Sequence, residues 1–340
     1  MRKKVLFLIP LFFLIIAPVV IQSSFIHHMF ILIFFYIALS VAWNILALSG
    51  NISLGHGAFF GLATYTSVLL LIKYDITPWV GVLAGVGVSL VGAFAMCLPL
   101  LRLRGPMFAL ATIAFVEVLR QVAVTWRSLT GGSEGLTTPF KPGWFYLVFP
   151  SKVPFYYIFL FLAVSSIYIS HRIYHSPIGY HSRAIADDEE AAQLLGVNTK
   201  RVQMVALFWS AGITGVLGVF FSQYTYMIDP EWAFSLMLFS VQPALNGIIG
   251  GLGTVFGPVL GAIVMTPLGE YLRSYLGALQ QGLNFFVYGL LLIVVVMIAP
   301  GGIFSGLTPI LQRIQLTRAT QAMADVHSHL ETPTKKEKDE

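Results

Sequence analysis

The stretch MFILIFFYIALSVAWNILALS, residues 29–49, carries no charged side chain over a length that can cross a lipid bilayer as a helix. Similar runs recur along the 340-residue chain, in which 57% of the residues are hydrophobic and only 10% are charged. An ordinary soluble domain has about 25% charged residues. The composition therefore excludes a soluble globule and a disordered chain, and a single cysteine, Cys97, excludes an internal disulfide.

Ten apolar runs have lengths near the ~20 residues of a membrane-spanning helix. We therefore expect an all-α, polytopic transmembrane helical bundle, whose segments are 5–22, 29–49, 56–72, 79–101, 106–126, 154–170, 204–223, 233–250, 251–272 and 283–299. The eighth and ninth segments are joined through Gly250–Gly253 without a polar loop, so one of them is expected to be re-entrant or broken. The first segment lacks a clean cleavage site, which favours an uncleaved span over a signal peptide.

The distribution of Lys and Arg predicts the orientation of the bundle. Ten segments place both termini on one side of the membrane, and most of the 20 Lys and Arg residues fall on that side. The opposite side holds only Lys73, Arg127, Lys141, Lys152 and Arg273. The positive-inside rule therefore predicts cytoplasmic termini. We expect one membrane domain over residues 1–315 and a polar, disordered cytoplasmic tail over residues 316–340.

The largest cytoplasmic loop, expected over residues 171–203, carries the densest charge cluster of the chain, Asp187–Glu190. Asp187 followed three residues later by Glu190 fits the N-terminal cap of a helix. Gly196 can end that helix in the left-handed conformation. The pattern predicts a short helix bounded by breaks, and a simple interfacial turn is the alternative.

Glu190-Ala191-Ala192 followed by Gly196 resembles the core of the EAA loop of ABC importer membrane subunits. Two alanines offer a small, close-packing surface, and the flanking acids can pair with basic residues of a partner. The resemblance implies that a cytoplasmic ATPase docks on this loop. The residues expected to couple the ATPase to the membrane part are Asp187, Asp188, Glu189, Glu190, Ala191, Ala192 and Gly196.

Further motifs, spread over about residues 30–275, make the chain similar to the branched-chain amino acid ABC permeases of the LivM type. These motifs are Ser53–Gly61, Leu101–Pro106 with Phe108 and Ala109, Thr130–Ser133, Ser176-Pro177 with Gly179, Pro230-Glu231 and Gly250–Gly253.

The resemblance implies an inner-membrane permease subunit of a bacterial ABC importer for branched-chain or related hydrophobic amino acids. Its implied partners are a second, LivH-like permease, two cytoplasmic ATPase subunits, a periplasmic substrate-binding protein and membrane lipid, and no nucleic acid. The exact substrate and the choice between a heterodimeric and a homodimeric pore are left open.

Five polar residues are candidates for the amino acid pathway: Ser53, His56, Glu117, Arg120 and Asn246. Glu117 and Arg120 share one helix face within a span, where charges usually face protein or water. They either line the pathway or form an ion pair that only fixes packing. His56 either serves the pathway or makes a structural hydrogen bond. The breaks near Ser53 and Gly250–Gly253 either pack helices closely or expose backbone groups to substrate, and Asn246 lies in an unusually polar mid-membrane stretch.

Several signatures are absent from the sequence. It contains no Gly-Lys dipeptide and hence no phosphate-binding loop, so ATP would be used by partner subunits. It also has no HExxH or CxxC pattern, and the spaced pair His171 and His175 has no Cys or carboxylate partner nearby. We therefore expect no enzyme activity and no catalytic, cofactor or metal site. The alternatives are a urea, amide or aromatic-acid ABC permease, and a secondary transporter coupled to protons or sodium through Glu117.

Overall fold

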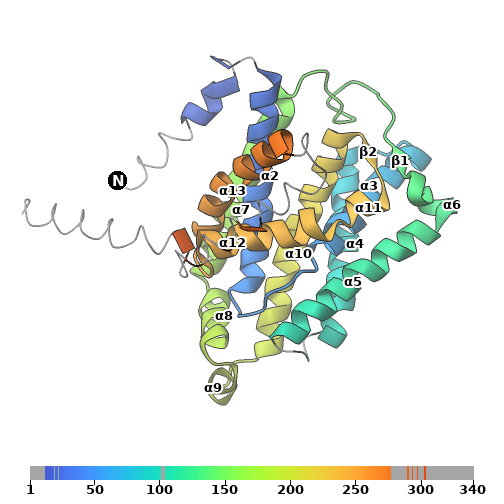
Figure 1. The fold of residues 1–340 in the computed structure, drawn as a ribbon. Helices are drawn as coiled ribbons and strands as arrows, with labels where there is room; N and C mark the ends of the chain where they lie inside the picture. Colours follow the sequence, from blue (N-terminus) through green and yellow to red (C-terminus); the bar gives the residue numbers. More distant parts are fainter. Residues whose placement is uncertain are drawn as a thin grey trace, which may run out of the picture.

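The computed structural model describes residues 12–276, apart from 19, 22, 101, 102 and 104, together with residues 289, 290, 293, 297, 302 and 303. The chain folds into a helical bundle with one two-stranded sheet (Figure 1). The long helices are α2 (Ser24–Ala47), α3 (His56–Tyr74), α4 (Pro78–Leu100), α5 (Pro106–Thr125), α7 (Val153–Tyr174), α10 (Thr199–Thr225) and α13 (Gly257–Leu276). The short elements are α6 (Arg127–Thr130), η1 (Gly132–Glu134), β1 (Leu136–Thr137), α8 (Pro177–Asp187), α9 (Glu189–Leu194), β2 (Met227–Ile228), α11 (Pro230–Ala233), the π-helical η2 (Met237–Val241) and α12 (Gln242–Gly251).

Seven helices of the described chain are long and apolar enough to cross a membrane. Six are α2, α3, α4, α5, α7 and α10, and the seventh is the composite helix Pro230–Gly251, made of α11, η2 and α12. These helices match the second to eighth predicted segments, and α13 matches the ninth. Half of the predicted segment 5–22, most of the segment 283–299 and the whole tail 316–340 lie outside the described residues. The total of ten spans and the side on which the termini lie stay predictions.

Local sequence explains where these helices begin and end. Gly105, at a φ of +55°, leads into Pro106, whose fixed φ suits the first position of α5. Asp75 ends α3 in the left-handed conformation, with a φ of +52°. The side chain of Asn198 accepts a hydrogen bond from the backbone N–H of Arg201 at 3.1 Å and so caps α10.

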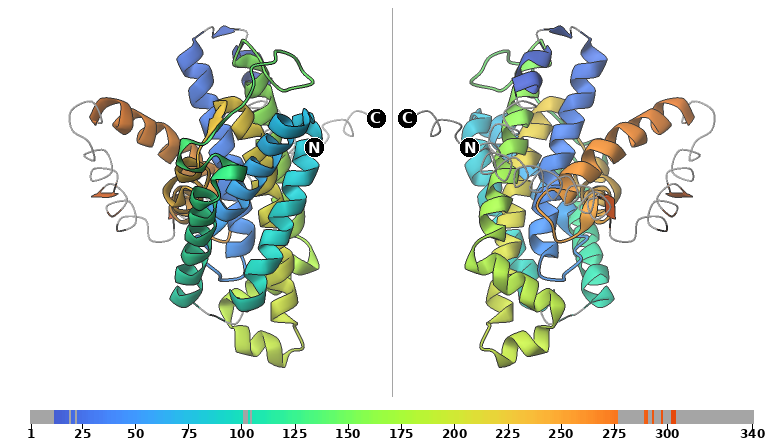
Figure 2. Two further views of the ribbon diagram at one scale, coloured as in Figure 1. Left: turned by 90° about the vertical axis from the view of Figure 1, so that its right-hand side faces the viewer. Right: turned by 90° about the vertical axis from the view of Figure 1, so that its left-hand side faces the viewer.

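Helix α2 lies at the centre of the bundle, and α5 lies on its flank (Figures 1 and 2). In the most apolar 18-residue stretch of α2, 83% of the residues are buried inside the protein, against 22% in that of α5. Stacked aromatic rings fill the space between α2, α3, α10 and η2, with centroid distances of 4.1 Å between Phe35 and Phe221 and 3.7 Å between Phe60 and Phe239. Because α5 contributes little to this core, most of its surface is left open to a membrane or a partner.

Helices α12 and α13, from the eighth and ninth predicted segments, form a tight hairpin. The chain breaks after Gly251 and re-enters as α13, which confirms the predicted interruption at Gly250–Gly253. A Cβ atom at Gly250 would overlap the carbonyl of Gly257, and one at Gly261 would overlap the carbonyl of Asn246. Asn44 of α2 ties down the turn: its amide nitrogen donates to the carbonyl oxygen of Thr254 at 2.8 Å. Glycine is therefore required here for close helix approach.

The two ends of the bundle carry different structures (Figures 1 and 2). At one end, β1 and β2 pair antiparallel, with Leu136 opposite Ile228, and join the chain after α5 to the start of α11. An ion pair between Lys141 and Asp75 at 2.5 Å lies outside the spans. At the other end, α8 and α9, which connect α7 to α10, project from the bundle.

Candidate functional site

The projecting segment α8–α9 is shaped by side-chain caps. Asp188 precedes α9, and its carboxylate accepts hydrogen bonds from the backbone N–H groups of Glu190 at 2.9 Å and Ala191 at 3.0 Å. The predicted cap, Asp187, is instead the last residue of α8. The shift by one residue follows from the break at Asp188, whose extended backbone separates the two helices. Gly196 leaves α9 at a φ of +86°, which confirms the predicted left-handed exit.

The inner and outer faces of α9 differ from the sequence-based expectation. Ala192 is 3% exposed and packs against Ile185 of α8 and Val202 of α10, so it belongs to the interior of this chain. The expected docking surface made of both alanines is therefore wrong for Ala192, while Ala191 is exposed. The side chains that project most are Leu194 and Leu195, which are 90% and 85% exposed.

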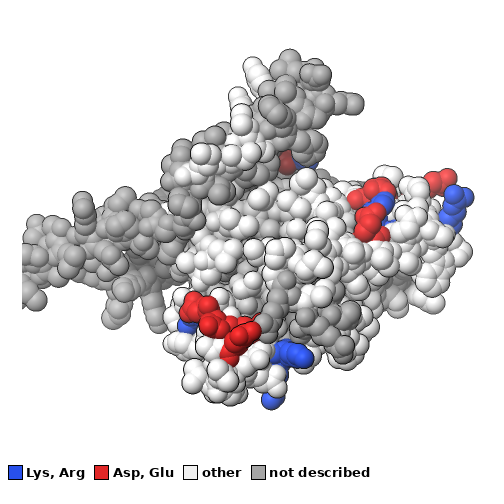
Figure 3. Space-filling view, turned by 60° about the horizontal axis from the view of Figure 1, so that its bottom comes forward, with Lys and Arg blue, Asp and Glu red and all other residues white. Residues whose placement is uncertain are grey.

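Acidic side chains gather beside this apolar tip. Asp187, Asp188 and Glu190 are exposed, and Figure 3 shows one acidic group at the bottom of the molecule with separate basic side chains beside it. The tip thus presents two protruding leucines next to several carboxylates. The leucines carried a signal in the sequence, because two consecutive large apolar residues just before a glycine that ends a helix point in different directions and cannot both face the interior.

Three of the five pathway candidates form a buried polar centre, made of Ser53, His56 and Asn246, which are at most 1% exposed. The carbonyl oxygen of Ser53 accepts from the indole N–H of Trp43 at 2.7 Å. His56 Nε2 lies 2.6 Å from Ser210 Oγ. Asn246 donates to Ser40 Oγ at 3.1 Å. These contacts join α2, α3, α10 and α12, and they enclose all three residues within a single chain.

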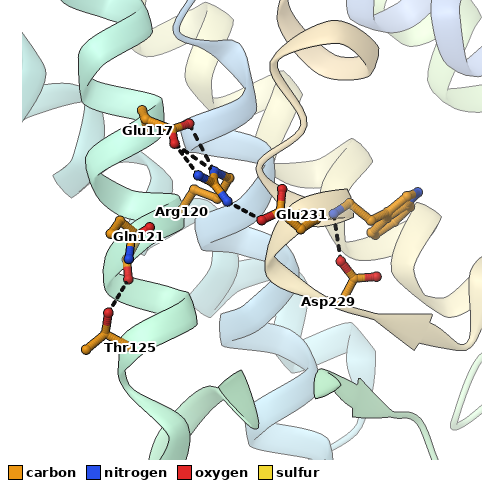
Figure 4. Close-up of polar contacts among 7 residues, drawn as sticks. Glu117, Arg120, Gln121, Thr125, Asp229 and Glu231 are labelled. Atoms are coloured by element: carbon orange, nitrogen blue, oxygen red, sulfur yellow. Dashed lines mark hydrogen bonds and ion pairs between the residues drawn. The ribbon is translucent and has the colours of Figure 1, made fainter. Parts of the chain in front are cut away.

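The other two candidates, Glu117 and Arg120, lie at the protein surface, where they contact Glu231. The sequence analysis did not identify Glu231 as a charge partner. Arg120 Nε lies 3.0 Å from both carboxylate oxygens of Glu117, and its guanidinium also contacts Glu231 of α11 (Figure 4). The side chains of Glu117 and Glu231 are 56% and 69% exposed, against 21% for Arg120. We call these three residues the α5 charged cluster.

The position of Glu231 follows from its local sequence. The carboxylate of Asp229 accepts from the backbone N–H of Trp232 at 2.9 Å and caps α11, with Pro230 at its first position (Figure 4). This cap starts the helix beside α5, where Glu231 in its first turn meets Arg120. Asp-Pro-Glu after a span is a helix-start signal, but only the packing of α11 against α5 shows which residue it pairs with.

The exposed side of α5 continues as a polar stripe away from this cluster. Glu117, Gln121 and Thr125 are spaced four residues apart and are all exposed, so they share one helix face (Figure 4). A surface hollow of about 500 Å³ lies along it, lined by Val118, Gln121, Val122, Thr125 and Trp126. Valine and tryptophan side chains flank Gln121 and Thr125 on this side, so only Glu117 places an ionisable side chain on the stripe, where water or protein is the expected surrounding.

Comparisons with known proteins agree with this architecture. The model of the family described as "Branched-chain amino acid transport system / permease component" matches residues 25–296. The chain is 29% identical over 299 residues to the LivM permease protein of the high-affinity branched-chain amino acid transport system of Escherichia coli, covering 80% of this chain and 69% of that protein. It is 30% identical over 266 residues to LivM of Salmonella typhimurium, covering 71% of this chain and 62% of that protein.

A second type of permease protein from the same kind of system is also similar. LivH of Salmonella typhimurium is 25% identical over 272 residues, which cover 75% of this chain and 85% of LivH. No solved structure matches the chain. The family model covers most of the chain, including every span described above except the start of α2. The chain therefore belongs to the family of branched-chain amino acid transport system permease components.

Proposed function

We propose that the chain is one permease subunit of an ATP-driven importer of branched-chain or related hydrophobic amino acids in a bacterial inner membrane. The observation that carries this proposal is the α5 charged cluster, which joins the half of the candidate span α5 nearer the β1–β2 end to the first turn of the candidate span Pro230–Gly251. Charged side chains within a span usually face protein or water rather than lipid. This face therefore needs protein or water, and a second permease packed across it would enclose a polar route.

The chemistry of the cluster suits an amino acid. Arg120 lies between two carboxylates, Glu117 and Glu231, so the three groups together carry a net negative charge. A guanidinium binds a carboxylate, and a carboxylate binds an ammonium group, through charge-assisted hydrogen bonds. An amino acid zwitterion supplies both groups, so it can exchange partners with the cluster as it passes.

The α8–α9 tip is the proposed docking element for a cytoplasmic ATPase. Leu194 and Leu195 would enter an apolar groove of the ATPase, and the neighbouring Asp187 and Asp188 would pair with its basic residues. Burying one leucine contributes about 1.5–3 kcal/mol. This assignment places the tip and both termini in the cytoplasm and the β1–β2 end at the periplasmic side, where a binding protein would deliver substrate.

The partners proposed for the complete importer are a LivH-like permease, two ATPase subunits and a periplasmic binding protein. The relatives support this set, since LivM and LivH are both permease proteins of high-affinity branched-chain amino acid transport systems. ATP is then used by the partner subunits, and this chain itself performs no catalysis.

The docking assignment is tested with the double variant Leu194→Ala/Leu195→Ala in the reconstituted complex. We expect the ATPases to copurify at least about tenfold less well, since the loss of two buried leucine side chains exceeds 1.4 kcal/mol. Leu83→Ala on α4, where the leucine is 76% exposed, is the matched control and should copurify normally. Full retention of the ATPases by the double variant would refute the docking assignment.

A self-contained, ion-coupled transporter is the second candidate function. Glu117 would be its proton carrier, but the bidentate contact with Arg120 holds this carboxylate in its charged form. Uptake by the lone chain in liposomes with an ion gradient would support the secondary transporter, and ATP-dependent uptake only in the full complex supports the importer. A ligand screen on the cognate binding protein distinguishes branched-chain amino acids from urea, amides and aromatic acids.

A further inference from the structure

A long apolar groove follows one side of α10, where α4 and α7 flank it. Its middle part has a volume of about 480 Å³ and is lined by Val86 and Leu90 of α4, Ile169 of α7 and a row of α10 residues. Its upper part, of about 660 Å³, shares Val216 and reaches Trp79, Trp144 and Tyr157. Almost no polar atom lines either part, so the groove is unsuited to water or a polar solute.

The floor of the groove is a single face of α10. Val205, Phe208, Gly212, Val216 and Phe220 follow one another at spacings of three or four residues, which place them in one line along the helix. From Val205 to Val216 this line is about 16 Å long at 1.5 Å per residue. That length is about half of the ~30 Å hydrocarbon core of a bilayer, so it matches one leaflet.

The lower end of the groove is basic. A hollow of about 460 Å³ shares Val205 with the apolar part and is lined by Arg201, His181 and Asn198, next to the turn at Gly196. Arg201 and His181 are exposed, and Arg201 forms no ion pair within the part of the chain that the structure describes. A cationic side chain thus lies one helical turn from the start of a membrane-deep apolar groove.

An occupant must therefore join a long hydrocarbon chain to a negatively charged head. We propose that the groove binds one anionic phospholipid from the leaflet on the α8–α9 side, with its phosphate at Arg201 and an acyl chain along α10 from Val205 to Val216. The aromatic residues Trp79, Trp144 and Tyr157 mark the opposite membrane interface, where such side chains concentrate. This site is independent of the transport pathway on α5.

The groove can be filled without disturbing the fold. A Cβ atom at Gly212 would meet only Leu90 Cδ2, at 4.0 Å, which is an ordinary contact. Gly212→Leu therefore occupies the space of the acyl chain, and leucine is also the better helix former. Gly87→Leu is the matched control, because Gly87 is an exposed α4 residue outside the groove with no atom within 4 Å of an added Cβ.

The test is native mass spectrometry of the purified full-length permease, titrated with phosphatidylglycerol and phosphatidylcholine of identical acyl chains. We expect one tightly retained phosphatidylglycerol on the unaltered chain and on Gly87→Leu. Gly212→Leu should retain about tenfold less of either lipid, since excluding two CH₂ groups of the acyl chain from the groove has an effect of at least that size. Equal retention by Gly212→Leu and Gly87→Leu would overturn the proposal.

The head-group half of the proposal is tested by charge. Arg201→Gln should lower the preference for phosphatidylglycerol over phosphatidylcholine about fivefold, the effect of one basic side chain near an anionic lipid. Lys200→Gln, the neighbouring exposed cation that does not line the hollow, should leave the preference unchanged. An unchanged preference in Arg201→Gln would refute the assignment of the phosphate to Arg201.

A photo-crosslinking residue in place of Phe208, in native membranes, identifies the occupant directly. A crosslinked product that carries phospholipid supports the proposal. A peptide crosslink, whether to another part of this chain or to another protein, would show that a polypeptide fills the groove and would overturn it.

Discussion

The buried polar centre and the α5 charged cluster look alike in the sequence and differ in the structure. Both consist of polar residues inside or next to predicted spans, yet Ser53, His56 and Asn246 are enclosed by their own chain, whereas Glu117 and Glu231 are more than half exposed. A polar residue that finds its partner within the chain adds to folding, and one that projects from the chain is available to a ligand or a partner subunit. We therefore propose a role in stability for the first group and a role in transport for the second, although His56 Nδ1 and Asn246 Oδ1 have no hydrogen-bond partner within the described residues.

The largest expected effect is on the packing around the buried polar centre. Gly261→Ala places a methyl group on the carbonyl oxygen of Asn246, so the α12–α13 hairpin has to open. We expect a loss of about 3 kcal/mol or more, at the upper end of overpacking effects. The measurement is the amount of monodisperse permease recovered in detergent, with Gly87→Ala, where an added Cβ meets nothing, as the control. Normal recovery of Gly261→Ala would show that the hairpin is looser than described.

The second effect concerns His56. His56→Ala removes the partner of Ser210 Oγ and leaves a cavity, and we expect a loss of about 2–3 kcal/mol in stability. Uptake should fall only in proportion to the amount of folded protein. Thermal unfolding and transport per folded complex are measured side by side, with Ser210→Ala as the partner control. Normal stability combined with lost uptake would move His56 into the pathway and break the comparison.

The third effect concerns the α5 charged cluster. Glu117→Gln should leave folding and assembly unchanged, because the side chain is 56% exposed. We expect about tenfold slower uptake, the equivalent of one charge-assisted hydrogen bond to substrate at about 1.5–3 kcal/mol. Glu231→Gln should behave in the same way, since it contacts the same guanidinium. If either variant instead loses assembly, the cluster only fixes helix packing.

The smallest effect is expected from a surface pair outside the spans. The hydrogen bond from Lys141 lowers the pKa of the Asp75 carboxyl below its ordinary value. A carboxyl with a lowered pKa stabilises the fold above its unfolded pKa, and this contribution is lost as pH falls through its folded pKa. Lys141→Gln should therefore leave uptake unchanged and lower the unfolding temperature slightly at pH 7. A difference from the unaltered chain that persists after Asp75 is protonated would point to another role for Lys141.

The sequence was sufficient for the elements that the bilayer dictates. Apolar runs of bilayer length predicted α2 to α5, α7, α10 and the segments around Gly251, because hydrocarbon thickness fixes the length of a span. It was insufficient for the rotation of each helix about its axis. The sequence around His56 does not reveal that its side chain faces Ser210, and the sequence around Glu117 does not reveal that its side chain faces outward. Both orientations depend on which helices pack against α3 and α5.

The packing of neighbouring helices, which the sequence does not reveal, also shapes the α8–α9 tip. Asp188 caps α9 in place of the predicted Asp187. Ala192 faces inward and Leu194 faces outward, because α8 and α10 contact α9 from one side. The two-residue pairing of Leu136 with Ile228 is also invisible in the sequence, since two residues carry no periodic pattern.

The pairing of β1 with β2 has a mechanical consequence. Helix α10 is an unbroken rod of 27 residues, about 40 Å long, whose lower end follows α9 and whose upper end leads into β2. Strand β2 pairs with β1, which lies after α5 in the chain. Helix α11, which follows β2, contains Glu231, and its carboxylate contacts Arg120 of α5. If a partner moves α9, as we propose, α10 would carry the motion as a rigid helix to the β1–β2 pair, which α6 and η1 connect to α5. On this path, motion at one membrane surface would reach the α5 charged cluster through the β1–β2 pair and through the contact of Glu231 with Arg120.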